Sequence, residues 1–164
     1  MVKNLSNRKK TEFLNHLNSK PSIEDNDNNL AKFCKFNFSF LDLSQEHSGK
    51  IDDSQLISLL IEKLLSYSSQ PLDYWREQRV GSGKQSVLEI YKTFPSKSGF
   101  KEPKGIPHEA LWARFRMDGK KRLVGFILPK EFDSKKHSSG YGFDINTFYV
   151  VFLDPLHKFY IANK

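Results

Sequence analysis

At 164 residues the chain falls in the usual size range of one domain, so a second full domain is not expected. Lys and Arg number 26 against 19 Asp and Glu, and the net charge of +7 at pH 7 favours polyanionic partners such as nucleic acid, although excess lysine can also serve solubility alone. Only 38% of the residues are hydrophobic but fourteen are Phe, and this composition favours a sheet over a helical bundle. No apolar run in the sequence is long enough to cross a membrane.

The first 30 residues are rich in Asn, Lys and Ser. Met1 is followed by a polar segment and not by the apolar stretch of a signal peptide, so we expect a cytoplasmic protein. A short helix is expected after Ser6, which can serve as its N-cap. Residues 22–29 have the composition of a linker. We therefore predict a polar, partly disordered and mobile arm over 1–30, followed by a single α+β domain over 31–164.

Ordered structure is expected from Phe33 onward, where apolar residues alternate with polar ones: Cys34, Phe36, Phe38 and Phe40. This period of two predicts a strand over 33–40 with one buried face. Cys34 is the single cysteine, so it cannot form an internal disulfide, as expected for a reducing compartment. The five His residues lack the spacing of zinc ligands, so we expect no metal and no cofactor.

A helix is predicted from Ser54 to Tyr67. Asp53 precedes it and supplies an N-cap and a favourable negative charge. Its apolar residues recur at spacings of three and four, and further ones widen the stripe, so we expect burial on most of its circumference: Leu56, Ile57, Leu59, Leu60, Ile61, Leu64 and Leu65. A second, short helix is predicted over 72–79, after Pro71.

Residues 81–86 read Gly-Ser-Gly-Lys-Gln-Ser and look like part of a phosphate-binding loop. The earlier glycine of that motif is missing, and the segment follows a short helix, whereas such a loop leaves a buried strand and starts a helix. We therefore interpret it as a flexible turn. A strand is predicted over 87–94, and a surface loop over 95–107, where three Pro and two Gly occur.

The clearest pattern is a hairpin, in which the runs 111–117 and 121–128 alternate around Asp118-Gly119. Arg114 and Arg116 share one face of its first strand. Lys121 or Arg122 joins them on the second strand, and which of the two does so depends on the register. If Arg116 lies opposite Arg122, the like charges repel and an anionic ligand would relieve the repulsion. The alternative is a solvated polar face that binds nothing.

The chain ends with a long loop over 129–146, a strand over 147–153, a tight turn at Asp154-Pro155 and a short return over 158–161. With the earlier elements, this pattern predicts an α+β fold. We expect an antiparallel sheet of four to five strands packed against one main helix and one short helix. The basic face should lie opposite the main helix or at the end of the sheet.

Directly beyond the last long strand come an imidazole, His157, and a phenol, Tyr160. His157 can serve as acid or base because its ordinary pKa lies near neutral pH. The arginines, with Lys121 and Lys158, can bind RNA phosphates, and Tyr160 can stack a base or assist proton transfer. These groups would suffice for RNA cleavage by its own 2′-hydroxyl without a metal. Taken alone, His157 can equally be a turn residue, and Tyr160 can simply cover the edge of the sheet.

The segments Leu111-Trp-Ala-Arg-Phe-Arg and Arg122-Leu-Val, with a final strand followed by His157 and Tyr160, resemble the last three strands of the RelE/YoeB family of ribonuclease toxins. The resemblance implies a RelE-like fold, a cytoplasmic mRNA endonuclease that is either ribosome-associated or free, and an antitoxin partner. It also implies that Arg122, His157 and Tyr160 are the catalytic positions. The chain departs from the family in its length, its N-terminal arm and an extra strand over 87–94, and the family's acidic base has no clear counterpart.

Two function hypotheses follow. The first is a metal-independent endoribonuclease of the toxin type that uses His157, Arg122 and Tyr160. The second is a non-catalytic module that binds nucleic acid or an acidic protein through the same basic face. A defence or mobile-element protein with other chemistry is a third possibility. The enzyme hypothesis requires that the imidazole of His157 and the guanidinium groups of the hairpin meet at a common point.

Overall fold

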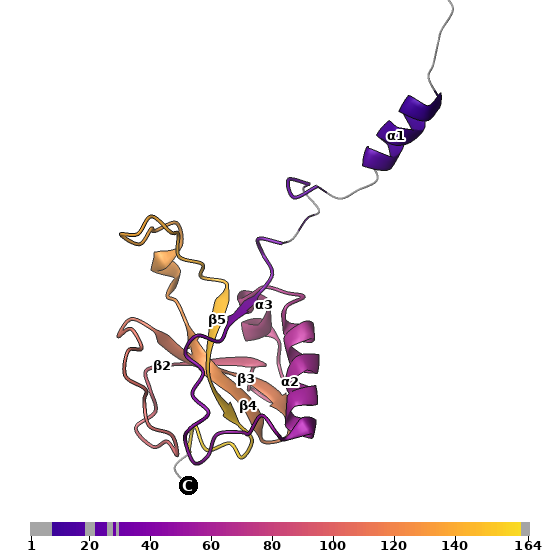
Figure 1. Cartoon of the computed structure of the whole chain (residues 1–164). Helices are drawn as coiled ribbons and strands as arrows, with labels where there is room; N and C mark the ends of the chain where they lie inside the picture. Colours follow the sequence, from indigo (N-terminus) through magenta and orange to yellow (C-terminus); the bar gives the residue numbers. More distant parts are fainter. Residues whose placement is uncertain (1–7, 19–21, 26–27, 29, 162–164) are drawn as a thin grey trace, which may run out of the picture. The chain divides into compact units, whose positions relative to one another are not determined.

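The computed structural model describes residues 8–18, 22–25, 28 and 30–161 (Figure 1). The chain divides into two compact units, Met1–Ala31 and Lys32–Lys164, and this division falls next to the boundary expected from composition. In the first unit, α1 spans Arg8–Asn18. The expected N-cap at Ser6 and part of the expected disorder lie outside the described residues. None of the helices in the described part of the chain has the length and apolar character that a membrane crossing requires.

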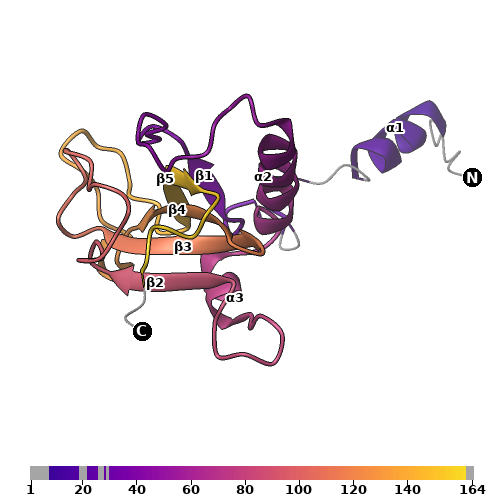
Figure 2. The same ribbon diagram turned by 90° about the horizontal axis from the view of Figure 1, so that it is seen from below.

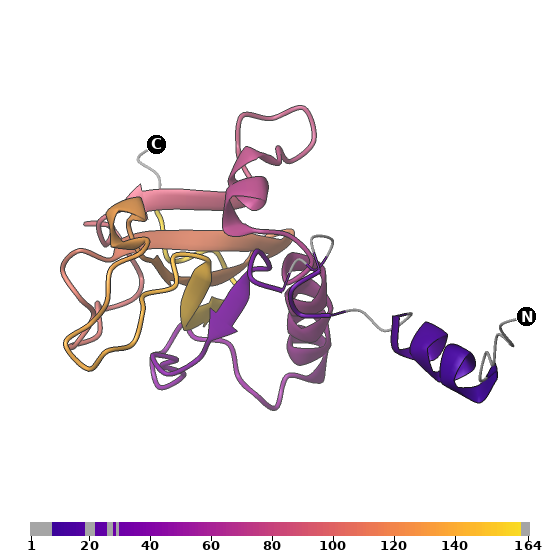
Figure 3. The ribbon, with the colours of Figure 1, turned by 90° about the horizontal axis from the view of Figure 1, so that it is seen from above.

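The second unit is an α+β domain on a five-stranded sheet with the order β1-β5-β4-β3-β2. Its strands are β1 (Lys35–Asn37), β2 (Leu88–Lys92), β3 (Leu111–Asp118), β4 (Lys121–Ile127) and β5 (Thr147–Asp154). The last four form an antiparallel meander, whereas β1 lies beside β5 in parallel (Figure 3). The predicted α+β class is confirmed, but the sheet is mixed. No tight turn fixes the direction of β1, because two helices separate it from the meander.

The main helix, α2, spans Ser54–Tyr67, as the sequence predicts. The side chain of Asp53 caps it by accepting a hydrogen bond of 3.0 Å from the backbone N–H of Leu56. The expected burial of most of its circumference is wrong, since Ile61 and Leu65 are 52% and 73% exposed. The sheet covers only the side of α2 that carries its buried residues, Leu56, Leu60 and Tyr67.

The two faces of the sheet carry separate hydrophobic cores. The core on the α2 side includes Ala113, Phe115, Leu123, Phe148 and Val150. The second face carries Trp112, Val124, Phe126 and Phe152, and these pack against Phe100 and Phe159. The covering of the second face therefore comes from the loop after β2 and from the chain after β5. Figure 2 shows this C-terminal segment, in yellow, crossing β3 and β2.

Several predicted elements are shorter in the structure, including the strand predicted over 87–94, which is β2. The strand predicted over 33–40 is reduced to β1, because the side chain of Asn37 accepts a hydrogen bond from the backbone N–H of Ser39 and turns the chain. The second helix, α3, spans Leu72–Glu77. The predicted return over 158–161 is not a strand, since backbone N–H groups there bind a side chain instead of a neighbouring strand.

The glycine-rich segment 81–86 is a turn, as interpreted from the sequence. The backbone N–H of Val80 donates to the carbonyl of Gln85 at 3.0 Å and closes it. The turn leads into β2, and no helix begins there that could hold a phosphate at its N-terminus.

Candidate functional site

The register of the hairpin places three arginines on the second face of the sheet. β3 pairs Arg116 with Arg122 and Arg114 with Val124. Since successive side chains of a strand alternate between faces, Arg122 joins Arg114 and Arg116, whereas Lys121 points to the other side. The alternative left open by the sequence is thus resolved in favour of Arg122. The two arginines of the direct pair repel each other across the strands.

The edge strand β2 brings a carboxylate and a phenol to the same face. Glu89 pairs with Arg114 across the strands, and one of its carboxylate oxygens accepts a hydrogen bond from the backbone N–H of Ser86. The ring of Tyr91 lies under the guanidinium of Arg114, with 5.7 Å between Cζ and the ring centroid. Such a cation–π contact stabilises the guanidinium in this position.

The turn after β5 is built around a buried carboxylate. Asp154 is 1% exposed and accepts three backbone hydrogen bonds, from Leu156 at 3.3 Å, Lys158 at 2.9 Å and Phe159 at 2.8 Å. Within this turn His157 has a φ of +58°, the left-handed region that non-glycine residues rarely adopt. Backbone strain of this kind persists only where surrounding contacts enforce it. Here those contacts are the backbone hydrogen bonds accepted by Asp154. The turn therefore fixes the direction of the imidazole.

The imidazole meets the arginines. Nε2 of His157 lies 2.6 Å from Nη1 of Arg114. A guanidinium has only donors, so Nε2 must accept this hydrogen bond, and the ring is the neutral tautomer with its proton on Nδ1. The spatial condition set by the enzyme hypothesis is met. We refer to Arg114, Arg116, Arg122 and His157 as the Arg–His cluster.

The cluster concentrates positive charge. Glu89 and Asp154 lie opposite Arg114 and Arg122 on the neighbouring strands, but neither carboxylate comes within ion-pair distance of these guanidiniums. Arg114 and Arg122 are only 6% and 4% exposed, and across the described residues no carboxylate lies within 4.0 Å of any nitrogen of the three guanidiniums. Nη1 of Arg122 donates to the carbonyls of Gly119 and Lys121, at 2.7 and 2.8 Å. Nε of Arg114, Nε of Arg122 and the hydroxyl of Tyr91 are buried and find no hydrogen-bond partner in the part of the chain that the structure describes. Buried donors without partners are costly, so they favour a ligand that accepts.

The electrostatics of the cluster appear in the pKa values of its members. Burial and the neighbouring guanidiniums of Arg114 and Arg116 lower the pKa of Arg122 to about 10, so it stays charged at neutral pH. Burial, and then Arg114 and Arg122, lower the pKa of His157, so the imidazole is neutral at pH 7. Burial raises the pKa of the Tyr91 phenol, against the opposing effect of Arg114. An imidazole that is neutral at pH 7 can accept a proton, and the surrounding cations can hold an anion.

The other predicted site residues lie outside the cluster. Tyr160 stacks on Tyr91, with the ring centroids 5.0 Å apart and the planes at 18°, so it reaches the cluster only through Tyr91. Lys121 lies on the other side of the hairpin. The side chain of Lys158 is exposed, and its backbone N–H, not its ammonium group, helps to form the turn. The structure therefore groups Arg114, Arg116, Arg122 and His157 and separates Lys121 and Lys158 from them.

Two residues of the site were missed from the sequence. Tyr91 belongs to a strand that a long loop separates from the hairpin, so no local pattern sets its register against Arg114. Asp154 was interpreted as half of an Asp-Pro turn. Its position at the end of a strand, followed by backbone N–H groups within five residues, is typical of a capping side chain and is the signal that could have identified it.

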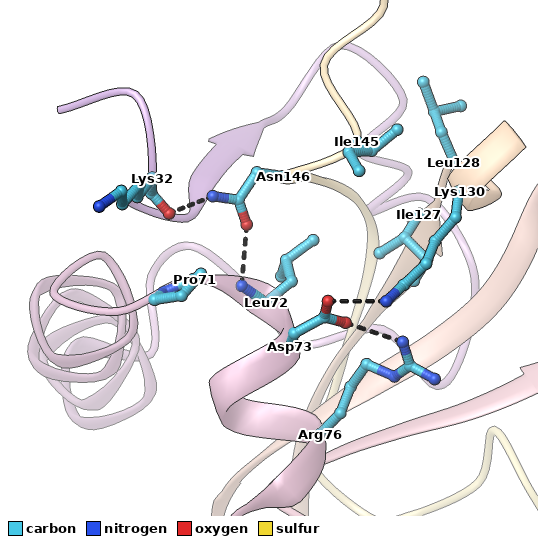
Figure 4. Close-up of a pocket in the computed structure, with 10 residues that line it drawn as sticks. All are labelled: Lys32, Pro71, Leu72, Asp73, Arg76, Ile127, Leu128, Lys130, Ile145 and Asn146. Atoms are coloured by element: carbon cyan, nitrogen blue, oxygen red, sulfur yellow. Dashed lines mark hydrogen bonds and ion pairs between the residues drawn. The ribbon is translucent and has the colours of Figure 1, made fainter. Parts of the chain in front are cut away.

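A second concave region lies at the opposite end of the hairpin (Figure 4). It is a pocket of about 250 Å³ with mostly apolar walls: Pro71, Leu72, Ile127, Leu128 and Ile145. Its single carboxylate, Asp73, is shared by two cations, because it accepts from Arg76 at 2.8 Å and from Lys130 at 2.9 Å. None of the residues predicted as functional lines this pocket.

Comparisons with protein-family models, with curated proteins and with solved structures find no match to this chain. Any assignment of function must therefore start from the chemistry of the Arg–His cluster.

Proposed function

We propose that the protein is a metal-independent endoribonuclease of the toxin type, which cleaves RNA through attack of the 2′-hydroxyl on the adjacent phosphate. The observation that carries the proposal is the contact of 2.6 Å between His157 Nε2 and Arg114 Nη1 inside a group of three arginines that form no ion pair with a carboxylate of the described residues. An acid–base group and several phosphate-binding groups thus lie within one hydrogen bond of each other.

The cluster suits a scissile phosphate. Arg116 and His157 are half-buried and form its accessible edge, whereas Arg114 and Arg122 lie beneath them. A non-bridging phosphate oxygen would accept the N–H of Arg114 that His157 now accepts. The charge that develops on the phosphorane would be stabilised by guanidiniums in surroundings with little water, where electrostatic interactions are strong.

The same exchange of hydrogen-bond partners on Arg114 frees His157 to act as the general base. When the phosphate takes the N–H of Arg114, the lone pair of His157 Nε2 is released beside the substrate. It then accepts the proton of the 2′-hydroxyl as the bond from the 2′-oxygen to phosphorus forms and the bond to the 5′-oxygen breaks. The 5′-oxygen takes a proton from water, because Tyr160 reaches the cluster only through Tyr91. The products are a 2′,3′-cyclic phosphate and a 5′-hydroxyl.

The resemblance to RelE and YoeB extends the proposal to partners and location. We place the enzyme in the cytoplasm, with mRNA as substrate, free or on the ribosome. An antitoxin would inhibit it by covering the Arg–His cluster with acidic side chains, which would form ion pairs with the guanidiniums. The net charge of +7 favours both interactions.

The test is cleavage in the presence of EDTA. Purified protein incubated with RNA, alone and with ribosomes, should produce 2′,3′-cyclic phosphate ends. His157→Ala should abolish them. The matched control is His108→Ala, because His108 is an exposed histidine whose only charged contact is Glu109, at 3.3 Å. RNA that stays intact both with and without ribosomes would contradict the proposal.

A second candidate is a non-catalytic module that binds nucleic acid or an acidic protein. It is favoured by the hydrogen bond between His157 and Arg114, because an imidazole whose lone pair is already occupied can act as a support for the guanidinium alone. Both candidates bind polyanions less tightly as salt increases, so only turnover separates them. The binding module predicts a complex with RNA that remains uncut in every condition above.

A further inference from the structure

A pocket of about 310 Å³ lies next to the Arg–His cluster, on the same face of the sheet. Two segments distant in the sequence form it: the end of β2 with the loop that follows, and the last described residues of the chain. Its lining comprises Tyr91, Thr93, Phe94, Pro95, Ser96, Lys97, Tyr160 and Ile161. A backbone hydrogen bond of 3.2 Å from Ile161 to the carbonyl of Lys97 joins the two segments.

The walls of this pocket are aromatic but not closed. Tyr91 and Tyr160 stack with their planes at 18°, and Phe94 adds a third ring. Tyr160 is 43% exposed, so its ring surface is available to a further planar partner. Exposed aromatic rings beside basic groups are the usual way in which proteins hold the bases of single-stranded nucleic acid. Within the pocket, Thr93 and Ser96 can form hydrogen bonds with the edge of such a base.

The pocket is coupled to the cluster through Tyr91. The Arg114 guanidinium carbon lies 5.7 Å from the centroid of the Tyr91 ring, and the centroid of Tyr160 lies 5.0 Å from the same point. A nucleotide carries its phosphate and its planar base on opposite sides of one ribose. A ligand with its phosphate on Arg114 therefore has the pocket within reach of its base.

We propose that this pocket holds one unstacked nucleobase adjacent to the phosphate bound by the Arg–His cluster, so that the substrate class is single-stranded RNA. The inference rests on the proposed function for the position of the phosphate. A base in a duplex is stacked and paired and cannot enter a pocket of this kind, so double-stranded RNA is excluded.

The test compares ligands that share a phosphate and differ in the base. Inorganic phosphate, ribose 5-phosphate and uridine and adenosine 5′-monophosphates are titrated against the full chain by calorimetry. We expect at least one nucleotide to bind about 5- to 150-fold more tightly than ribose 5-phosphate, which is the usual contribution of one stacked base. We also expect Tyr160→Leu to remove this difference, and Tyr160→Phe, which keeps the ring, to retain it.

The controls separate the two proposals. Tyr141→Leu changes an 80% exposed tyrosine outside the pocket and should alter no affinity. Equal binding of ribose 5-phosphate and both nucleotides would overturn the base pocket while leaving the phosphate site intact. Failure of inorganic phosphate to bind, with nucleotides still bound through Tyr160, would overturn the phosphate site alone. Equal cleavage of a single strand and of its duplex would contradict the proposed substrate class even if the cleavage itself is confirmed.

Discussion

The two ends of the β3–β4 hairpin use arginine in opposite ways. At one end Arg76 and Lys130 share the carboxylate of Asp73, and all three side chains are substantially exposed (Figure 4). At the other end Arg114 and Arg122 are almost fully buried, and their nearest polar partners are an imidazole and two backbone carbonyls. Both ends carry clustered positive charge, but at only one of them do the cations form direct ion pairs with a carboxylate of the described residues.

This difference separates a structural ion pair from a binding site. An exposed ion pair such as Asp73–Arg76 adds little to stability and gives no reason to expect a bound ligand. Buried guanidiniums without a counter-ion lower stability, because they lose hydration and repel each other. A bound anion would offset the charge of these buried guanidiniums. We therefore expect the two ends of the hairpin to respond very differently to the same substitutions.

The largest difference is expected in RNA cleavage. If the proposed mechanism holds, Arg122→Ala removes one of the guanidiniums that stabilise the developing charge and should lower kcat by about 10²- to 10³-fold, as for the loss of one oxyanion donor. Arg76→Ala removes an arginine already neutralised by Asp73 and should change kcat by less than about twofold. The measurement is the initial rate of cleavage of a labelled RNA by each variant. Equal losses in the two variants would mean that general charge, and not the cluster, drives the reaction.

A smaller effect, of opposite sign, is expected in stability. Arg122→Met replaces an unneutralised buried cation with an apolar side chain of similar length and should raise the free energy of unfolding by about 1 kcal/mol. The carbonyls of Gly119 and Lys121 lose their donor, but Gly119 is exposed and Lys121 half-buried at the turn, so both can bind water. Arg76→Met should stay within about 0.5 kcal/mol of the parent protein. Urea unfolding measures both changes, and destabilisation by Arg122→Met would show that the cluster is a structural element.

The features of the fold that could be predicted from the sequence are those that local patterns determine. The bounds of α2, its Asp53 cap and the Asp-Gly hairpin depend on spacing and capping within a few residues, and the structure has all three. The convergence of Arg114 and His157 was predicted as a condition of the function, because an antiparallel meander brings the end of the last strand near the hairpin. The choice between Lys121 and Arg122 stayed open, since one residue of register exchanges the two faces.

The remaining parts of the site depend on contacts between distant segments. Tyr91 reaches Arg114 only because β2 pairs with β3 across a long loop, and its register includes an irregularity between Ile90 and Lys92. The parallel direction of β1 and the exposure of Ile61 on α2 are likewise set by what lies opposite them. Periodicity identifies an apolar stripe but not the width of the surface that covers it.

The smallest effect is expected in the pH dependence of the stability that His157 contributes at one end of the hairpin and Asp73 at the other. The folded-state pKa values of His157 and Asp73 are both lowered, His157 by burial and by Arg114, and Asp73 chiefly by the hydrogen bond from Lys130. A lowered pKa means that the unfolded chain binds the proton more readily. Stability is therefore fully present above the unfolded pKa and is lost as the pH falls through the folded one. The loss due to His157 begins below about pH 6.5, and that due to Asp73 only below about pH 4.

A bound anion should reverse this effect at one end only. Phosphate on the Arg–His cluster offsets the guanidiniums that disfavour the imidazolium, so it should raise the pKa of His157 and leave that of Asp73 unchanged. Side-chain NMR titration of the imidazole and carboxyl resonances, with and without inorganic phosphate, measures both. In His157→Gln the slope of stability between pH 5 and 7 should become shallower. A His157 pKa that does not respond to phosphate would mean that the anion binds elsewhere, because an anion in contact with Arg114 lies beside the only proton-accepting nitrogen of that ring.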